Sequence, residues 1–161
     1  MLTIRIPLLE FDKRPVVKLY NMDALIDTGA YIPTFTTSAT FLLNNFQAKV
    51  LFEKVPVGGI GGIAQGKIYR LQNFRVGRLN FECLDVFVPD KKRLDYEFLL
   101  SATMFYGFSY GFNAENKCFE INMPDAALLS RKFEVARLKE RFCSKVDGLL
   151  LQTFATVAAL R

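Results

Sequence analysis

One stretch organises this chain: ALIDTGA, at residues 24–30. Its three apolar residues lead into an acid, which is typical of the end of a buried strand. Gly29, two residues after Asp27, permits a sharp turn at this point. The pattern therefore places Asp27 at the edge of a hydrophobic region, where a carboxylate is costly unless it is hydrogen-bonded or shares a proton. Thr28 can donate one such bond; a simple turn capped by Asp27 is the alternative interpretation.

A second stretch is rich in glycine: GGIGG, at residues 58–62. It lies between two strand-like runs, residues 50–57 and 67–74, in which apolar and polar side chains alternate. Glycines between two strands predict a hairpin with a tight, mobile tip. A hairpin that opens and closes at its tip can serve as a flap over a cleft.

The same glycines also match two nucleotide-binding patterns. Residues 59–64 fit G-x-G-x-x-A, and residues 61–67 fit G-x-x-x-x-G-K. Both patterns require a helix that starts at the glycines, because its N-terminus holds the phosphate. Residues 67–74 alternate with the period of a strand instead, so we reject nucleotide binding.

Taken together and in this order, the two motifs resemble those of the retropepsin-like, retroviral-type aspartic proteases. The resemblance covers residues 1–122 and implies a mainly β fold, an acid-protease β-barrel with short helices. The residues themselves predict a short helix over residues 37–44, with Thr36, Thr37 or Ser38 as its cap. A second apolar strand at residues 98–105 runs into a helical turn, as in the family, where such a strand passes beneath the catalytic loop. In this chain Ser101 stands where the family usually has Gly, and Thr103 where it has Asn or Asp.

The resemblance also implies the roles of individual residues. The catalytic residues would be Asp27, Thr28 and Gly29, with a water activated between two Asp27 carboxylates that share one proton. The chain holds a single D-T-G, so a homodimer must supply the second carboxylate. The substrate-binding residues would be Ala30, Gly58, Gly59, Ile60, Gly61, Gly62 and Leu100. Phe35, Ile60, Ile63 and Leu100 are interpreted either as subsite walls or as ordinary core.

The composition limits the chemistry. Histidine is absent, which removes Ser-His and Cys-His nucleophile pairs and any histidine-ligated metal site. Carboxylates, Lys, Tyr and Cys remain, and for a protease the aspartic mechanism follows. We therefore expect no metal and no cofactor. Half of the residues are apolar and 16 are Phe, enough to build a core.

The cysteines and the N-terminus favour a cytoplasmic setting. Cys83, Cys118 and Cys143 are an odd, scattered set, typical of reduced thiols. The first residues alternate like a strand and lack the basic and apolar regions of a signal peptide.

The remaining residues, 123–161, are interpreted as a C-terminal helical extension. Asp125 is placed to cap a helix that reaches about Cys143. Its basic side chains fit a solvated face better than a nucleic-acid-binding arm. The apolar run 149–160 is too short to span a bilayer. We favour its packing on the domain or on a partner subunit over contact with a membrane surface.

The sequence thus predicts an aspartic endopeptidase that acts on peptides as a homodimer. The alternative is a non-catalytic peptide-binding or assembly module on the same scaffold. A nucleic-acid-binding role ranks last, because only the net charge of +5 supports it.

Overall fold

The chain folds mainly into β-strands, as predicted. The computed structural model describes residues 1–10, 14–36, 43–59, 62–91 and 96–137 of the 161. Within these residues, eleven strands pair into one mixed sheet. The strands are β1 (Leu2–Glu10), β2 (Val16–Leu19), β3 (Met22–Asp27), β4 (Thr34–Phe35), β5 (Lys49–Gly59), β6 (Gly62–Val76), β7 (Leu79–Pro89), β8 (Phe98–Ser101), β9 (Ser109–Asn113), β10 (Cys118–Met123) and β11 (Ser130–Phe133). Two short 3-10 helices follow β8 and β10: η2 (Ala102–Phe105) and η3 (Ala126–Leu129).

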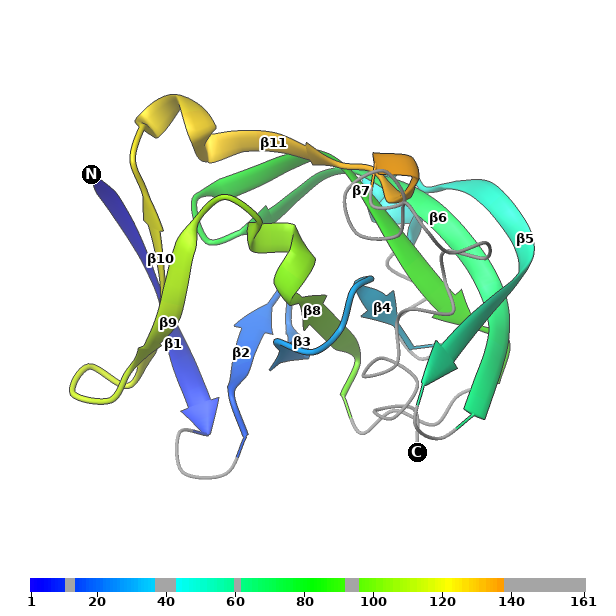
Figure 1. Ribbon diagram of the computed structural model, residues 1–161, viewed down its shortest axis with the longest axis horizontal. Helices are drawn as coiled ribbons and strands as arrows, with labels where there is room; N and C mark the ends of the chain where they lie inside the picture. Colours follow the sequence, from blue (N-terminus) through cyan, green and yellow to red (C-terminus); the bar gives the residue numbers. More distant parts are fainter. Residues whose placement is uncertain (11–13, 37–42, 60–61, 92–95, 138–161) are drawn as a thin grey trace.

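The sheet is open. Its strand order is β5-β6-β7-β4-β8-β3-β2-β1-β10-β9, and β11 lies beside β7. Figure 1 shows β1, β9 and β10 on one side of the molecule, the β5–β6 hairpin on the other, and β3, β4 and β8 between them. The mainly β fold with short helices is confirmed; in the described residues no pairing joins β5 to β9, so the sheet is not closed. Twist curls a sheet of this size, but closure also requires its two end strands to pair.

The centre of the sheet is a parallel pair, β3 with β8. Ala24 pairs with Phe98, and the register continues to Asp27 opposite Ser101. Parallel strands are normally covered on both faces, which explains why both are continuous apolar runs. All four residues of β8 are buried. The predicted second apolar strand and the turn after it are thus confirmed, and the ends of β3 and β8 lie side by side.

The glycine-rich stretch forms the predicted hairpin. Strands β5 and β6 are antiparallel, with Gly58 opposite Ile63 and Gly59 opposite Gly62 at the tip. Ile60 and Gly61 lie outside the described residues. Residues 62–76 are a single strand rather than a strand followed by a helix, which confirms the rejection of a phosphate-binding helix.

Aromatic side chains fill the core beneath the central strands. The rings of Phe35 and Phe98 meet edge to face with centroids 4.5 Å apart, and the ring of Phe74 lies 5.3 Å from that of Phe98. Phe35 and Leu100, predicted as subsite walls or as core, are both 0% exposed. The core interpretation therefore holds for both. Residues 43–46 form a 3-10 turn, whereas most of the helix expected over residues 37–44 lies outside the described residues.

The predicted helix from Asp125 to Cys143 is wrong where the structure describes it. Asp125 does act as a cap, because its Oδ1 accepts a hydrogen bond of 2.9 Å from the Ala127 N–H, but it caps only η3. Residues 130–133 then form β11, parallel to β7. Pairing with the open edge of β7 has overridden the local helical pattern. Residues 135–137 are helical, and the rest of the predicted helix and the apolar tail lie outside the described residues. None of the helices described could reach across a bilayer.

Candidate active site

The ALIDTGA stretch forms a tight turn at the end of β3. The Asp27 Oδ1 atom accepts a hydrogen bond of 3.0 Å from the Gly29 N–H. The Ala30 N–H in turn donates to the Asp27 carbonyl oxygen at 3.2 Å. Thr28 and Gly29 are exposed and Ala30 is buried, so the turn presents two of its residues at the surface and anchors the third. The backbone of Gly29 and Ala30 therefore holds the Asp27 turn in place.

The Asp27 carboxylate is partly buried, and its protonation is altered by that position. Burial raises the pKa of Asp27 above its ordinary value, and the hydrogen bonds from the Gly29 and Ala30 backbone oppose this rise only in part. In the described part of the chain no Lys or Arg lies within ion-pair distance of it. A partly buried acid without a cation holds a proton more readily, which is a property of acid–base catalysts.

Two hydroxyl groups connect the turn to the end of β8. The Thr103 hydroxyl donates to the Tyr31 carbonyl oxygen, just past the D-T-G residues. Because that hydroxyl has one proton, the contact of 2.8 Å between the Ser101 and Thr103 hydroxyls has Ser101 as its donor. The sequence singled out both residues as departures from the family pattern, but it did not reveal this link. Only the pairing of β3 with β8 makes the link possible.

A cleft of about 370 Å³ opens beside the turn. Thr28, Gly29 and Ala30 contribute to one wall, and residues 105–110 form much of the other. Aromatic side chains dominate this second wall, and Tyr106 is 51% exposed. Among the described residues, neither Leu100 nor the hairpin glycines line this cleft. Asp27 itself is not among its lining residues either, so the cleft adjoins the residues that follow Asp27, and its aromatic wall was missed by sequence reasoning.

The hairpin residues lie elsewhere in the sheet. Gly58 is buried, whereas Ile63 at the base of the tip is 69% exposed. Strands β7, β4 and β8 separate the hairpin strands from β3 in the sheet order. The pairing of strands in the sheet therefore does not by itself bring the hairpin tip to the Asp27 turn.

The other titratable groups of interest are the acids and the thiols. Among the described residues, no group of three or more Cys, Asp and Glu side chains is placed to hold a metal ion. Cys83 and Cys118 are free thiols, and burial raises the pKa of both. Thiols in this state are poor nucleophiles at neutral pH.

Comparison with known proteins gave one structural likeness. No family model and no curated protein matches the chain. Among solved structures, the chain is similar to a retropepsin-like aspartic protease from Rickettsia conorii. The two share 17% sequence identity and a TM-score of 0.49, over 74% of this chain and 90% of the other. At this level the likeness carries no functional assignment, which has to come from the residues of the site.

Proposed function

We propose that this protein is a retropepsin-like aspartic endopeptidase that works as a homodimer. The observation that carries the proposal is the Asp27 carboxylate, oriented by the Gly29 N–H at the end of the central parallel pair. Its pKa is raised by burial, and no cation accompanies it in the described residues. An acid in this position is suited to taking and giving a proton.

The reaction requires two such acids. Two carboxylates a few ångströms apart cannot both ionise, so they share one proton and titrate as a unit. The ionised member would take a proton from a water as it attacks the peptide carbonyl, and the protonated member would donate to the developing oxyanion. Because the chain has one D-T-G, the second Asp27 comes from a second copy across a two-fold axis.

The exposure of the turn supports this arrangement. Thr28 and Gly29 lie at the surface, where another copy of the chain can approach them. In the dimer, Thr28 of each chain would brace the carboxylate pair, and Gly29 and Ala30 would leave room for the substrate. Leu100, in the core below the turn, would support it from beneath.

The substrate would be an extended peptide. We assign the hairpin tip, Gly58 to Gly62 with Ile60 at its centre, to a flap that binds the peptide backbone by strand addition. The aromatic wall formed by residues 105–110 favours apolar side chains on either side of the cleaved bond.

The central test replaces Asp27 with Asn, which keeps the shape and removes the titrating group. Hydrolysis of a casein-like or fluorogenic peptide substrate between pH 4 and 7 is expected to fall by about 10²–10⁴-fold or more. The matched control is Asp23→Asn on the same strand, where the acid forms an exposed ion pair with Lys18, and it should keep full activity. Unchanged hydrolysis by Asp27→Asn would overturn the proposal.

A mixing experiment tests the shared pair directly. When wild-type chains exchange with a threefold excess of Asp27→Asn chains, random pairing leaves about one quarter of the wild-type chains with a wild-type partner. Activity per wild-type chain should fall to about that fraction. A site complete within one chain predicts no change. If wild-type protein binds peptides but never cleaves them, the chain is instead the non-catalytic binding module.

A further inference from the structure

The turn η2, which carries Thr103, ends in four consecutive carbonyl groups that all have partners. Carbonyl groups at the end of a helical turn lack partners within the turn and need donors from elsewhere. The Tyr106 N–H donates to the Thr103 carbonyl at 3.3 Å, and the Phe108 N–H donates to the Phe105 carbonyl at 2.9 Å. The other two carbonyls, those of Met104 and Tyr106, accept from a single side chain, Arg131.

Arg131 lies on β11, in the segment that follows the closing hairpin. Its Nη1 donates to the Met104 carbonyl at 2.9 Å and its Nη2 to the Tyr106 carbonyl at 2.8 Å. The guanidinium also stacks over the Phe108 ring, 4.1 Å from the centroid. A planar, forked donor can satisfy two carbonyls at once while it stacks on an aromatic ring, which a lysine cannot do. A cleft of about 340 Å³ opens between β11 and η2, and Arg131 bridges its walls.

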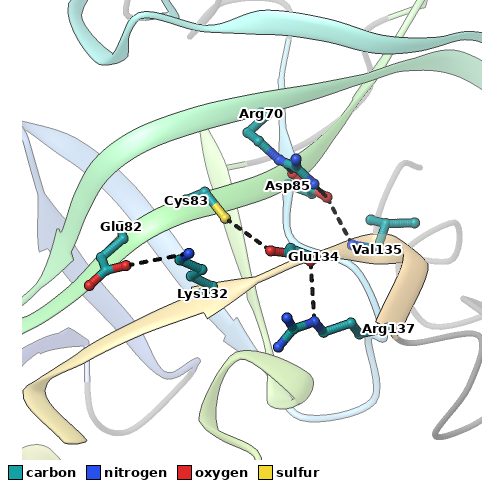
Figure 2. Close-up of polar contacts among 8 residues, drawn as sticks. All are labelled: Arg70, Glu82, Cys83, Asp85, Lys132, Glu134, Val135 and Arg137. Carbon is teal, nitrogen blue, oxygen red and sulfur yellow. Dashed lines mark hydrogen bonds and ion pairs between the residues drawn. The ribbon is translucent and has the colours of Figure 1, made fainter.

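The strand that carries Arg131 is itself firmly attached to the sheet. It pairs in parallel with β7, and a buried acid of β7, Asp85, holds its far end. Asp85 is 1% exposed, and it accepts a hydrogen bond of 2.8 Å from the Val135 N–H. Arg70 on β6 neutralises this acid through two bonds of 2.7 and 2.9 Å. Figure 2 shows this cluster, with the Lys132–Glu82 pair further along the same seam.

The opposite side of η2 contacts the turn of the proposed active site. Thr103 donates its hydroxyl proton to the Tyr31 carbonyl, four residues beyond Asp27. Three polar contacts, joined by the backbone of β11 and of η2, therefore connect the buried Asp85 to the Asp27 turn: Val135 with Asp85, Arg131 with the η2 carbonyls, and Thr103 with Tyr31. Each contact joins elements that are far apart in the sequence, so each fixes one element against another.

We propose that Arg131 is a positioning residue, through which the segment after the closing hairpin holds the Asp27 turn in its catalytic geometry. This inference rests on the proposed function. Arg131 acts through the Met104 and Tyr106 carbonyls at the end of η2 rather than on the Asp27 carboxylate. A displacement of about 1 Å in a catalytic group can cost about 10²-fold in rate, so the loss of this brace should appear in kcat.

The test compares three variants of the full-length chain. Arg131→Met removes the donors but keeps an unbranched side chain over Phe108, and Arg131→Lys keeps the charge and one of the two bonds. Lys132→Met is the matched control, because Lys132 neighbours Arg131 on β11 but makes only an exposed contact of 4.0 Å with Glu82. The first readout is kcat and KM for Asp27-dependent peptide hydrolysis. The second is amide hydrogen exchange at Gly29 and Ala30, which needs no activity.

Arg131→Met is expected to lower kcat by about 10–100-fold, with KM changed by less than about threefold. Exchange at Gly29 and Ala30 should accelerate by about tenfold, because the turn opens more often. Arg131→Lys should show a smaller fall in kcat and a smaller rise in exchange than Arg131→Met. Lys132→Met should match the wild type in kcat and in exchange. If Arg131→Met does not fold, the Arg131→Lys values decide between a partial loss and no loss.

Two results would overturn the inference. One is wild-type kcat and wild-type exchange at the turn in Arg131→Met, or in Arg131→Lys if only that variant folds. The other is an equal loss in Lys132→Met, which would indicate general loosening of β11. If the wild-type protein shows no Asp27-dependent hydrolysis, the proposed function fails, and the exchange rates still decide whether Arg131 holds the turn.

Discussion

Two carboxylates of this protein, Asp27 and Asp85, differ in how far their surroundings compensate for burial of the charge. Asp85 lies in β7 at 1% exposure, where Arg70 and the Val135 N–H supply three hydrogen bonds. Asp27 lies at the end of β3, partly buried; among the described residues the Gly29 and Ala30 backbone N–H groups stabilise its carboxylate and no cation pairs with it. The more deeply buried acid therefore has the complete set of partners, and the less buried acid does not.

The difference separates the structural role of Asp85 from the catalytic role that we propose for Asp27. Burying a charge costs several kcal/mol unless a partner of opposite charge and further hydrogen bonds offset it. At Asp85 this offset is present, and the result is a fixed connection between β6, β7 and the segment after β11. At Asp27 the offset is incomplete, so the pKa rises and the carboxyl keeps its proton to a higher pH than an ordinary Asp does. The following predictions test this contrast.

The largest effect on stability is expected at Asp85. Asp85→Ala leaves the Arg70 guanidinium and the Val135 N–H without their acceptor, and it should reduce the free energy of unfolding by about 3–5 kcal/mol. Urea unfolding at pH 7 measures this loss. Glu82→Ala, an exposed acid on the same strand, is the control and should stay within about 0.5 kcal/mol of the wild type. Equal losses of stability in the two variants would show that the contacts of Asp85 contribute no more to folding than those of an exposed acid.

Removing both charges should recover much of that loss. In Arg70→Met with Asp85→Leu, no buried ion is left unpaired, and only the Val135 N–H lacks an acceptor. We expect the double variant to be about 1–3 kcal/mol less stable than the wild type, the cost of one unsatisfied buried group. Arg70→Met alone should be less stable than the double variant, because it leaves the Asp85 charge buried. The reverse order of the two would contradict the assignment of Asp85 as an ion-paired anchor.

Replacing Asp27 should raise the free energy of unfolding, whereas replacing Asp85 lowers it, and the effect at Asp27 should depend strongly on pH. Because its folded pKa lies above the ordinary 3.8, the folded state binds more protons between these two values, and the free energy of unfolding falls as pH rises through that interval. The Asp27→Asn variant does not undergo this loss. Its free energy of unfolding should therefore equal that of the wild type below the ordinary pKa of Asp and exceed it at neutral pH.

This gain should be smaller than the loss at Asp85, because Asp27 is only partly buried. Urea titrations at fixed protein concentration, from pH 3 to 7, measure the difference between variant and wild type at each pH. Asp90→Asn, in an exposed turn, serves as the control. A stability advantage of Asp27→Asn that is constant across the range would contradict a raised pKa.

The smallest effect is expected at Ser101. Ser101→Ala removes the donor to the Thr103 hydroxyl, while Thr103 still donates to the Tyr31 carbonyl. The loss should be about 0.5–1.5 kcal/mol, the net value of one hydrogen bond. Thr103→Val removes both contacts and should cost more than Ser101→Ala. Equal costs would indicate that the contact with Tyr31 contributes nothing.

Local sequence patterns predicted the elements around Asp27 correctly. The apolar run before it, the glycine hairpin and the second apolar strand with its helical turn all formed as expected, because each depends on the alternation and turn chemistry of neighbouring residues. The prediction of a helix from Asp125 was wrong because it, too, depended only on neighbouring residues. The pattern after Asp125 favoured a helix, but residues 130–133 found backbone partners on β7, which the sequence could not indicate.

The amino-acid sequence by itself determined that one acid stands at the end of a buried strand, beside a glycine turn, in a chain without histidine. The tertiary structure alone decided which polar groups meet. Arg70 faces Asp85 because β6 and β7 pair in one register, and Thr103 reaches Tyr31 because β3 and β8 run in parallel. Partners that lie 15 to 72 residues apart leave no periodic signal in the sequence, and only the packing of the sheet brings them within hydrogen-bond distance.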